Sequence, residues 1–279
     1  MGMNDTEKKT EHSQTNCKTV IITSCKGGVG KSTVTANLAY ALAKRGERTL
    51  AVDCDFSNRS LDLIFGCENS VIYDICDVIG GRCDIDKAVM CDERCSELFF
   101  CAAPPLDEEK FTSEQFAEIL DKIKEKFELD YILIDTPGAV GETVELVANS
   151  ASSALIIVSH QPTAARAAER TGMMLDRFGI KEQKLIINAF DAEAVAGGLR
   201  SGINELIDKT KTQIIGIIPQ EYELSLSQEY GFLCAQIDNK NMKKVARAFD
   251  NIASRMCSQS VPLLKKVCPE RKRRKLIEK

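Results

Sequence analysis

The sequence lacks several features that would place it in common classes of protein. It has no tryptophan, only two histidines, and aromatic residues make up 6% of the chain. No window holds the roughly 18 uninterrupted apolar residues that a membrane-spanning helix needs. The first 17 residues are polar and contain no apolar run of the kind found in secretory signals. We therefore expect a cytoplasmic protein without a membrane-spanning helix.

Cysteine pairs with metal-binding spacing are also missing. The chain has twelve cysteines, but no two of them form a C-x-x-C pair, which argues against zinc ribbons. Without an export signal we expect these thiols to be reduced and to act as small hydrophobic side chains. The densest group, Cys83, Cys91, Cys95 and Cys101, leaves a metal or iron–sulfur cluster open as an alternative.

Charge is spread unevenly along the 279 residues, which are enough for one large domain or two small ones. The net charge is −4, so the whole molecule is not built to coat nucleic acid. From Lys265 to Lys279, however, eight Lys and Arg residues face two glutamates, a net charge of +6. The sequence thus predicts a basic tail attached to an acidic body.

Apolar runs that are typical of buried strands alternate with segments of helical periodicity. The expected strands are 19–23, 49–53, 98–102, 131–135, 154–159, 184–190 and 212–219. The expected helices are 31–46, 113–127, 142–150, 162–178, 203–209 and 241–256. Strands that are apolar throughout and separated by helices predict an α/β fold, a mostly parallel twisted sheet with helices on both faces. We expect one domain over 18–257, a flexible N-terminal extension over 1–17 and a basic C-terminal tail over 258–279.

The stretch SCKGGVGKST, from Ser24 to Thr33, has the composition of a phosphate-binding loop between a strand and a helix. Glycines let backbone N–H groups surround phosphate oxygens closely, and the helix that follows adds its positive end. In such a loop Lys31 contacts the β- and γ-phosphates and the Ser32 hydroxyl ligates Mg²⁺. Cys25 stands where the standard pattern has its first glycine, so the loop is a variant.

With Lys26 in front of it, the loop reads K-G-G-V-G-K-S and resembles the deviant Walker A motif of the ParA/MinD superfamily of P-loop ATPases. The resemblance implies an enzyme that binds ATP and Mg²⁺ and hydrolyses ATP as a homodimer. It implies that Lys26 reaches the partner's phosphates, as an arginine finger does, and that Lys31 also acts in catalysis. The nucleotide-binding residues that it implies are Lys26, Gly27, Gly28, Val29, Gly30, Lys31, Ser32 and Thr33.

Three aspartates follow strands that should end at one edge of the sheet, where ligands bind in folds of this class. By resemblance, Asp55 positions the attacking water and is catalytic, and Asp53 lies close to the metal. Asp135, in YILIDTPG, is similar to the carboxylate that holds Mg²⁺, a hard ion that prefers oxygen ligands. For Asp53 a cap at the end of the strand remains an alternative.

The stretch Arg59–Met90 is similar to the MinD branch of the superfamily, as is GIIPQE at Gly216–Glu221. This branch implies an ATP-dependent dimerising switch that positions the cell-division site. Its implied partners are an ATPase activator, a division inhibitor and the anionic inner face of the cell membrane, where the protein would be peripheral. Asn188 and Pro219 match positions that contact adenine in relatives. Two departures are Ser60, where the family has asparagine, and a tail that Pro269 interrupts.

Three other functions remain open. A relative that partitions DNA, or places flagella or pili, would bind chromosomal DNA through Lys and Arg, and its affinity would fall steeply with salt. A carrier for iron–sulfur assembly would resemble the Mrp scaffold proteins, against which the missing C-x-x-C pair counts. A scaffold without hydrolysis is disfavoured by the set Lys26, Lys31, Asp55 and Asp135. The tail could bind membrane, bind DNA or stay solvated.

Overall fold

The computed structural model describes most of the chain. The described residues are 17–104, 111–138, 141–159, 161, 163–200, 202–263, 265 and 276. The expected N-terminal extension before residue 17 and most of the expected basic tail lie outside them, so these two boundaries stay predictions. Leu276 is an exception within the tail, since its side chain is fully buried in the hydrophobic core.

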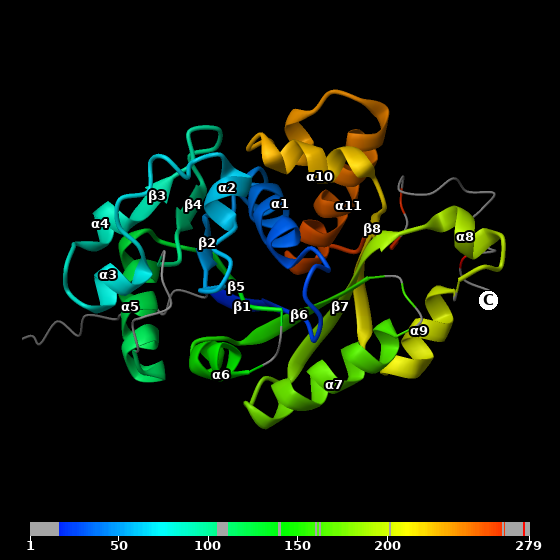
Figure 1. Ribbon diagram of the computed structural model, residues 1–279, viewed down its shortest axis with the longest axis horizontal. Helices are drawn as coiled ribbons and strands as arrows, with labels where there is room; N and C mark the ends of the chain where they lie inside the picture. Colours follow the sequence, from blue (N-terminus) through cyan, green and yellow to red (C-terminus); the bar gives the residue numbers. More distant parts are fainter. Residues whose placement is uncertain are drawn as a thin grey trace, which may run out of the picture.

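One mixed sheet of eight strands forms the centre of the described structure (Figure 1). Its strands in chain order are β1 Lys18–Thr23, β2 Thr49–Asp53, β3 Val89–Cys91, β4 Leu98–Cys101, β5 Tyr131–Asp135, β6 Ser153–Ser159, β7 Glu182–Phe190 and β8 Gln213–Pro219. Across the sheet they are ordered β3-β4-β2-β5-β1-β6-β7-β8. All pairs are parallel except β3 with β4, which is antiparallel at one edge. The expected mostly parallel sheet is confirmed.

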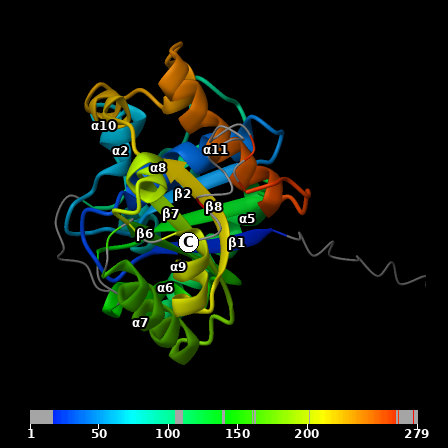
Figure 2. The ribbon, with the colours of Figure 1, turned by 90° about the vertical axis from the view of Figure 1, so that its right-hand side faces the viewer.

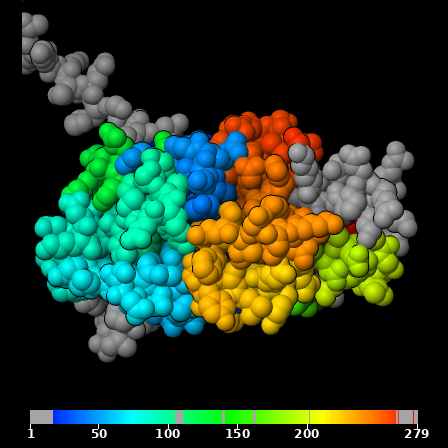
Figure 3. All heavy atoms as spheres, turned by 90° about the horizontal axis from the view of Figure 1, so that it is seen from above, coloured from blue at the N-terminus to red at the C-terminus, as the bar shows by residue number. Residues whose placement is uncertain are grey.

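Helices cover both faces of the sheet, as Figures 1 and 2 show. One layer contains α1 Lys31–Ala43, α2 Leu61–Phe65, α10 Tyr222–Glu229 and α11 Lys240–Met256. Seen from the outside in Figure 3, α11 lies beside α1 in this layer. The opposite layer contains α3 Ile75–Ile79, α5 Ser113–Lys126, α6 Glu142–Ala148, α7 Ala164–Arg177 and α9 Ile203–Thr210. Each helix layer packs on its own face of the sheet and forms a separate hydrophobic core. Side chains along a strand alternate between these two cores, with Ile21 in one and Ile22 in the other.

The short elements are the part that hydrophobic patterning did not predict. They are α2, α3, α4 Ile85–Ala88, β3, α8 Ala192–Ala196, α10 and the 3₁₀ turn Cys234–Gln236. Most of them have five residues or fewer, which is too short to show a helical or strand period. The long strands and helices of the prediction are confirmed with boundaries that shift by up to three residues.

Strand order explains why distant motifs meet. The phosphate loop follows β1, which lies between β5 and β6, and β2 lies on the far side of β5. Because these strands are parallel, their carboxyl ends reach the same edge of the sheet. Asp53 and Asp135 are direct partners in the register of β2 and β5. The segments after β1, β2, β5 and β6 therefore surround one site.

Candidate nucleotide-binding site

The phosphate loop is built around two glycines in the left-handed region. Gly28 has φ of 70° and Gly30 has φ of 87°, conformations that L side chains rarely adopt. A Cβ at Gly30 would also lie 2.4 Å from Asn188 Nδ2. The Gly30 carbonyl accepts a hydrogen bond from Val34 N at 2.9 Å, which starts α1. Cys25 is not among the residues with positive φ, so a non-glycine residue is tolerated there.

Lys31 is placed where the sequence predicted it. It is the first residue of α1, and only 6% of its surface is exposed. Its charge lies close enough to Asp135 to lower the pKa of that carboxyl group. A buried ammonium group at a helix N-terminus has an unfavourable helix dipole beside it, so it is best stabilised by an anion that contacts both. This arrangement suits a bound phosphate.

Asp53 and Asp135 form a buried acidic pair at the ends of adjacent strands. Both residues have no exposed surface. Burial, together with the charge of Asp53, raises the pKa of Asp135 to about 8. Burial also raises the pKa of Asp53, to about 6, although hydrogen bonds from backbone N–H groups oppose the rise. A bound cation would relieve the cost of keeping both carboxylates ionised.

Asp53 makes the hydrogen bonds of a cap. Its Oδ1 accepts from Asp55 N at 2.9 Å, and its Oδ2 accepts from Ser60 N and Leu61 N at 3.0 Å each. Ser60 N and Leu61 N lie at the start of α2, where a carboxylate is favourable, and Asp55 N lies in the loop before it. The contacts support the alternative that Asp53 holds the loop between β2 and α2. Metal binding by Asp53 remains a prediction, because both of its oxygens already have backbone donors.

Asp55 and Asp135 each have one buried oxygen that lacks a partner among the described residues. They are Asp55 Oδ1 and Asp135 Oδ2. Buried polar atoms are rarely left without hydrogen bonds, so such atoms point to an ion or water. The Ser32 hydroxyl lies close enough to Asp135 to lower the pKa of that carboxyl group, so both side chains belong to one set of oxygen ligands. These residues fit a Mg²⁺ ion that also contacts phosphate oxygens, with Ser32 and Asp135 as the holding side chains.

The acidic pair predicts a pH dependence of stability in metal-free buffer. The folded-state pKa of Asp135 is raised above its unfolded value of about 4, so the folded state holds an extra proton between these pH values. Stability should therefore fall as pH rises from about 5 to about 8. Asp135→Asn removes this loss. The free energy of unfolding of the variant, measured with urea, should therefore exceed that of the wild type by an amount that increases with pH. The increase is at most about 1.4 kcal/mol per pH unit.

The control for this prediction is Asp121→Asn on the solvent-facing side of α5. Asp121 is an exposed carboxylate whose charge carries little burial cost. The free energy of unfolding of Asp121→Asn should differ from that of the wild type by a constant amount over the same pH range. An Asp135→Asn difference that is also constant would contradict the buried pair as the source of the effect.

Lys26 lies at the outer side of the phosphate loop. Its side chain is exposed, and its Nζ donates to Gln161 Oε1 at 2.6 Å. Gln161 follows β6, which is next to β1, so this bond spans two neighbouring strand ends. The acceptor is a neutral amide and not a carboxylate, which leaves the charge of Lys26 available to an external anion. The expected role of Lys26 in a partner's site remains a prediction.

Several contacts of the site were not predicted from the sequence. Thr35 Oγ1 lies 3.2 Å from Asp135 Oδ1, and Ser60 Oγ donates to Ser32 Oγ at 2.8 Å. A Cβ at Gly138 would lie 2.7 Å from Gly27 Cα, so the segment after β5 packs directly on the phosphate loop. The glycine of DTPG was the one visible signal for this contact. The other contacts depend on how the loops fold.

A hollow of about 300 Å³ extends from the phosphate loop toward the ends of β7 and β8. Its residues include Gly28, Gly30, Asn188, Pro219 and Tyr222. The structure thus brings both expected adenine-contacting residues to the phosphate loop. Asn188 is buried and its Nδ2 donates to Val29 O at 2.8 Å, so it also supports the loop. Adenine contact by these two residues remains a prediction.

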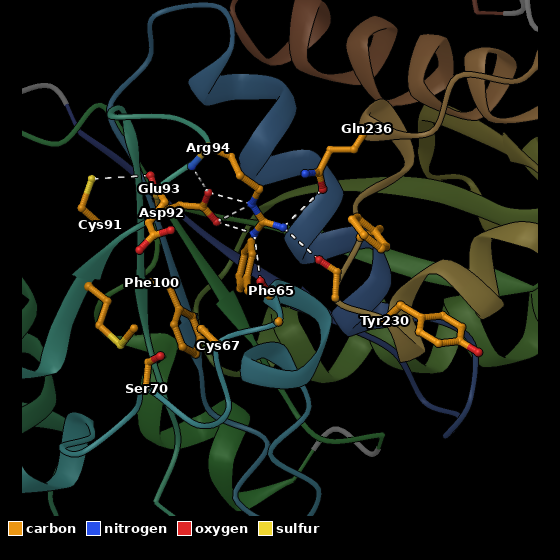
Figure 4. Close-up of a pocket in the computed structure, with 14 residues that line it drawn as sticks. Phe65, Cys67, Ser70, Cys91, Asp92, Glu93, Arg94, Phe100, Tyr230 and Gln236 are labelled. Atoms are coloured by element: carbon orange, nitrogen blue, oxygen red, sulfur yellow. Dashed lines mark hydrogen bonds and ion pairs between the residues drawn. The ribbon is translucent and has the colours of Figure 1, made fainter.

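A second hollow, of about 370 Å³, lies between α2, the β3–β4 hairpin and the segment after α10 (Figure 4). Arg94 is at its centre, but this guanidinium is fully engaged. It pairs with Asp92 and donates to Gly231 O at 2.9 Å and Phe65 O at 3.1 Å. Because Arg94 has no free charge to offer a phosphate, this hollow does not resemble a nucleotide site.

Among the described residues the cysteines form no disulfide bonds, and all of them except the exposed Cys91 are at least partly buried. Burial raises the pKa of Cys91 and Cys83, and burial raises that of Cys101 beyond the ordinary range. Thiols with a raised pKa are poor nucleophiles and poor metal ligands at neutral pH. In the described ranges no three His, Cys, Asp or Glu side chains are grouped so that they could hold a metal ion. The alternative of a metal or iron–sulfur cluster therefore has no support there.

Comparison with known proteins agrees with this site. The sequence model of the CobQ/CobB/MinD/ParA nucleotide binding domain matches residues 20–233. The chain belongs to this family. It is 33% identical over 247 residues to the septum site-determining protein MinD of Bacillus subtilis (strain 168), covering 88% of this chain and 90% of that protein. MinD of Helicobacter pylori is 34% identical over 250 residues, covering 87% and 91%. The expected MinD-like membership of the family is confirmed.

Solved structures give the same result for the fold. The MinC:MinD cell division protein complex of Aquifex aeolicus contains a chain with 33% identity and a TM-score of 0.80, over 88% of this chain and 98% of that one. A ParA family ATPase from Chlorobium tepidum TLS, at 19% identity and a TM-score of 0.69, shares the fold. The fold of the family and its nucleotide-binding class are thereby confirmed for this chain.

Proposed function

We propose that this protein is an ATPase of the MinD type, a switch that dimerises with ATP and Mg²⁺ and positions the site of cell division. The observation that carries the proposal is the meeting of Lys26, Lys31, Asp55 and Asp135 at one edge of the sheet. It is supported by identity above 30% to MinD proteins over nearly the whole domain. Hydrolysis by an isolated monomer would be slow, because the second lysine must come from a partner.

The proposed mechanism follows from the chemistry of the site. Lys31 and the N–H groups of the loop would hold the triphosphate, and Ser32 and Asp135 would hold Mg²⁺, which would neutralise charge on the phosphates. Asp55, with a buried oxygen that accepts no hydrogen bond from the described residues, would orient the attacking water. Lys26 of a second copy stabilises charge on the transferring phosphoryl group. Two loops with like charges repel without the triphosphates, so the dimer depends on ATP.

The proposed partners are a division inhibitor, an ATPase activator and the membrane surface. A MinC:MinD complex is known for a relative of 33% identity, which supports an inhibitor of the MinC type. Within the described residues no helix is long and apolar enough to cross a membrane. Peripheral binding would use the basic tail, where each Lys or Arg near an anionic surface contributes about 1 kcal/mol. Because Leu276 is buried, its insertion into lipid would require release from the core.

Sedimentation with vesicles tests this function. With ATP and Mg²⁺ the protein should pellet with vesicles that contain phosphatidylglycerol, and it should stay in the supernatant with ADP. Two tails on one dimer gain avidity, on the order of 10²-fold over one tail. Vesicles of phosphatidylcholine alone and a chain truncated after Gln259 are the controls, and both should fail to pellet. Equal pelleting of the truncated chain would remove the tail from the account.

The second candidate function is DNA partition, which the fold of the ParA relatives allows. Its supporting observation is the cluster of Lys and Arg in the tail, since phosphate contacts dominate binding without sequence preference. A gel shift with ATP and random duplex DNA distinguishes the two functions. A shift that disappears between about 50 mM and 200 mM salt, together with no vesicle pelleting, would favour partition.

A further inference from the structure

The hollow beside the phosphate loop is bordered by an exposed aromatic side chain. Tyr222 is the first residue of α10 and lines the hollow together with Pro219 and Asn188. Its surface is 76% exposed, which is high for so large a side chain. We propose that the Tyr222 ring stacks on the base of the bound nucleotide. The inference rests on the proposed function and assigns the residue that recognises the base.

The ends of the hollow differ in chemistry. One end consists of Gly28, Gly30 and Thr33 of the phosphate loop and α1. The other end consists of Pro219, Gln220 and Tyr222, where β8 passes into α10. A nucleotide with its phosphates at the first end has its base directed along the hollow toward the second. A flat, uncharged base then meets a proline ring and an aromatic ring, the surfaces on which bases stack.

The helix that carries Tyr222 is held in a fixed position relative to the phosphate loop. Thr33 Oγ1, on α1, donates to Gln228 Oε1 on α10 at 3.0 Å. The inner face of α10 is packed into the core through Leu224 and Ser227. The helix that carries Tyr222 is therefore tied to the helix that follows the loop. The backbone that carries the ring therefore does not have to be ordered on binding, which favours affinity.

Nothing in the described part of the protein uses the Tyr222 ring. Among those residues it has no aromatic neighbour, no cation over its face and no hydrogen bond to its hydroxyl. Covering such a ring with a base removes apolar surface from water and is favourable. Contact with a ligand would therefore stabilise the ring more than its present contacts do.

Tyr230 provides a matched comparison on the same segment. It follows the C-terminal end of α10 and is 73% exposed, almost as much as Tyr222. It lines the second hollow, where Figure 4 shows it extending away from Arg94. It is absent from the lining of the nucleotide hollow. Replacement of either tyrosine removes a similar ring, but only one of the two rings is placed to contact a base.

Calorimetric titration with two ligands tests the inference on the full-length protein. MgADP carries a base, whereas magnesium tripolyphosphate offers phosphates alone, and neither requires dimerisation. Tyr222→Ala should weaken MgADP binding by about 10-fold, or about 1.4 kcal/mol, and leave tripolyphosphate binding unchanged. Tyr222→Phe and Tyr230→Ala should bind both ligands as the wild type does. Unchanged MgADP binding by Tyr222→Ala would overturn the inference.

Tyrosine fluorescence gives a second readout, since the chain has no tryptophan. MgADP should quench part of the emission of the wild type and of Tyr230→Phe, and this part should be missing in Tyr222→Phe. Equal quenching in all three proteins would also overturn the inference, as would a Tyr222→Ala defect seen with ATP but not with ADP. Failure of the proposed function appears differently, as a wild type that binds neither MgADP nor tripolyphosphate.

Discussion

Replacing Lys26 with alanine is expected to lower the rate of ATP hydrolysis by about 10³-fold. The exposed Lys26 ammonium is bonded to the Gln161 amide and pairs with no carboxylate of the described residues, so its charge is available to a second molecule. In the transition state that charge would lie against the transferring phosphoryl group, where negative charge is dispersed over three oxygens. Alanine removes the cation but leaves the loop backbone in place.

Lys26→Ala should also fail to dimerise, but it should still bind the nucleotide. Light scattering of the wild type should give the mass of a dimer with ATP and Mg²⁺ and of a monomer with ADP, and Lys26→Ala should remain a monomer with both. Lys181→Ala, on an exposed lysine between α7 and β7, is the matched control and should behave as the wild type. Wild-type hydrolysis by Lys26→Ala would exclude the proposed role of this lysine.

Replacing Asp55 with asparagine is expected to lower the hydrolysis rate by about 10²- to 10⁴-fold, the range for a group that moves or orients a proton. Asp55 is buried, and its Oδ1 lacks a hydrogen-bond partner in the described structure, whereas its Oδ2 lies 3.4 Å from Asn58 Nδ2. An amide keeps the shape of the side chain but accepts protons poorly, so water is no longer activated. Unlike Lys26→Ala, this variant should still dimerise with ATP.

A single-turnover assay separates the effect on chemistry from an effect on binding. Asp55→Asn should retain the affinity for ATP and form a long-lived ATP dimer, because its loop and its Lys26 are intact. Asp121→Asn on α5 is the control for loss of one negative charge. An Asp55→Asn protein that hydrolyses ATP at the wild-type rate would assign the water-positioning role to another residue.

The parts of the fold that the sequence predicted are those with a long hydrophobic pattern. Strands such as β5 are apolar up to Asp135 at their end because both faces of the sheet are buried, and such a run is typical of a strand in a parallel sheet. The region between β2 and β4 was not resolved by pattern, because α2, α3, α4 and β3 have three to five residues each. The cap of α3 was a usable local signal, since Asp74 and Asp77 form a reciprocal capping box.

The residues of the site also fall into those that the sequence predicted and those that it did not. The phosphate loop and the aspartates at strand ends were visible because spacing along the chain determines them. Contacts such as Lys26 with Gln161, 135 residues apart, depend on strand order and loop conformation. Resemblance alone did not predict the contacts of Asp53. Its carboxylate accepts hydrogen bonds from two backbone N–H groups at the start of α2 and from one in the loop before that helix. Tyr222 lies in a short helix, whose sequence shows too few turns to predict which residues are exposed.

Mixing the two inactive variants tests most directly whether Lys26 acts across a dimer. In a mixed dimer, the Lys26→Ala subunit keeps its own Asp55 and receives Lys26 from the Asp55→Asn subunit, so one of the two sites is complete. The account predicts that an equal mixture hydrolyses ATP well above the sum of the rates of the separate variants. A mixture no faster than that sum, although a mixed dimer forms, would contradict the sharing of Lys26 between subunits.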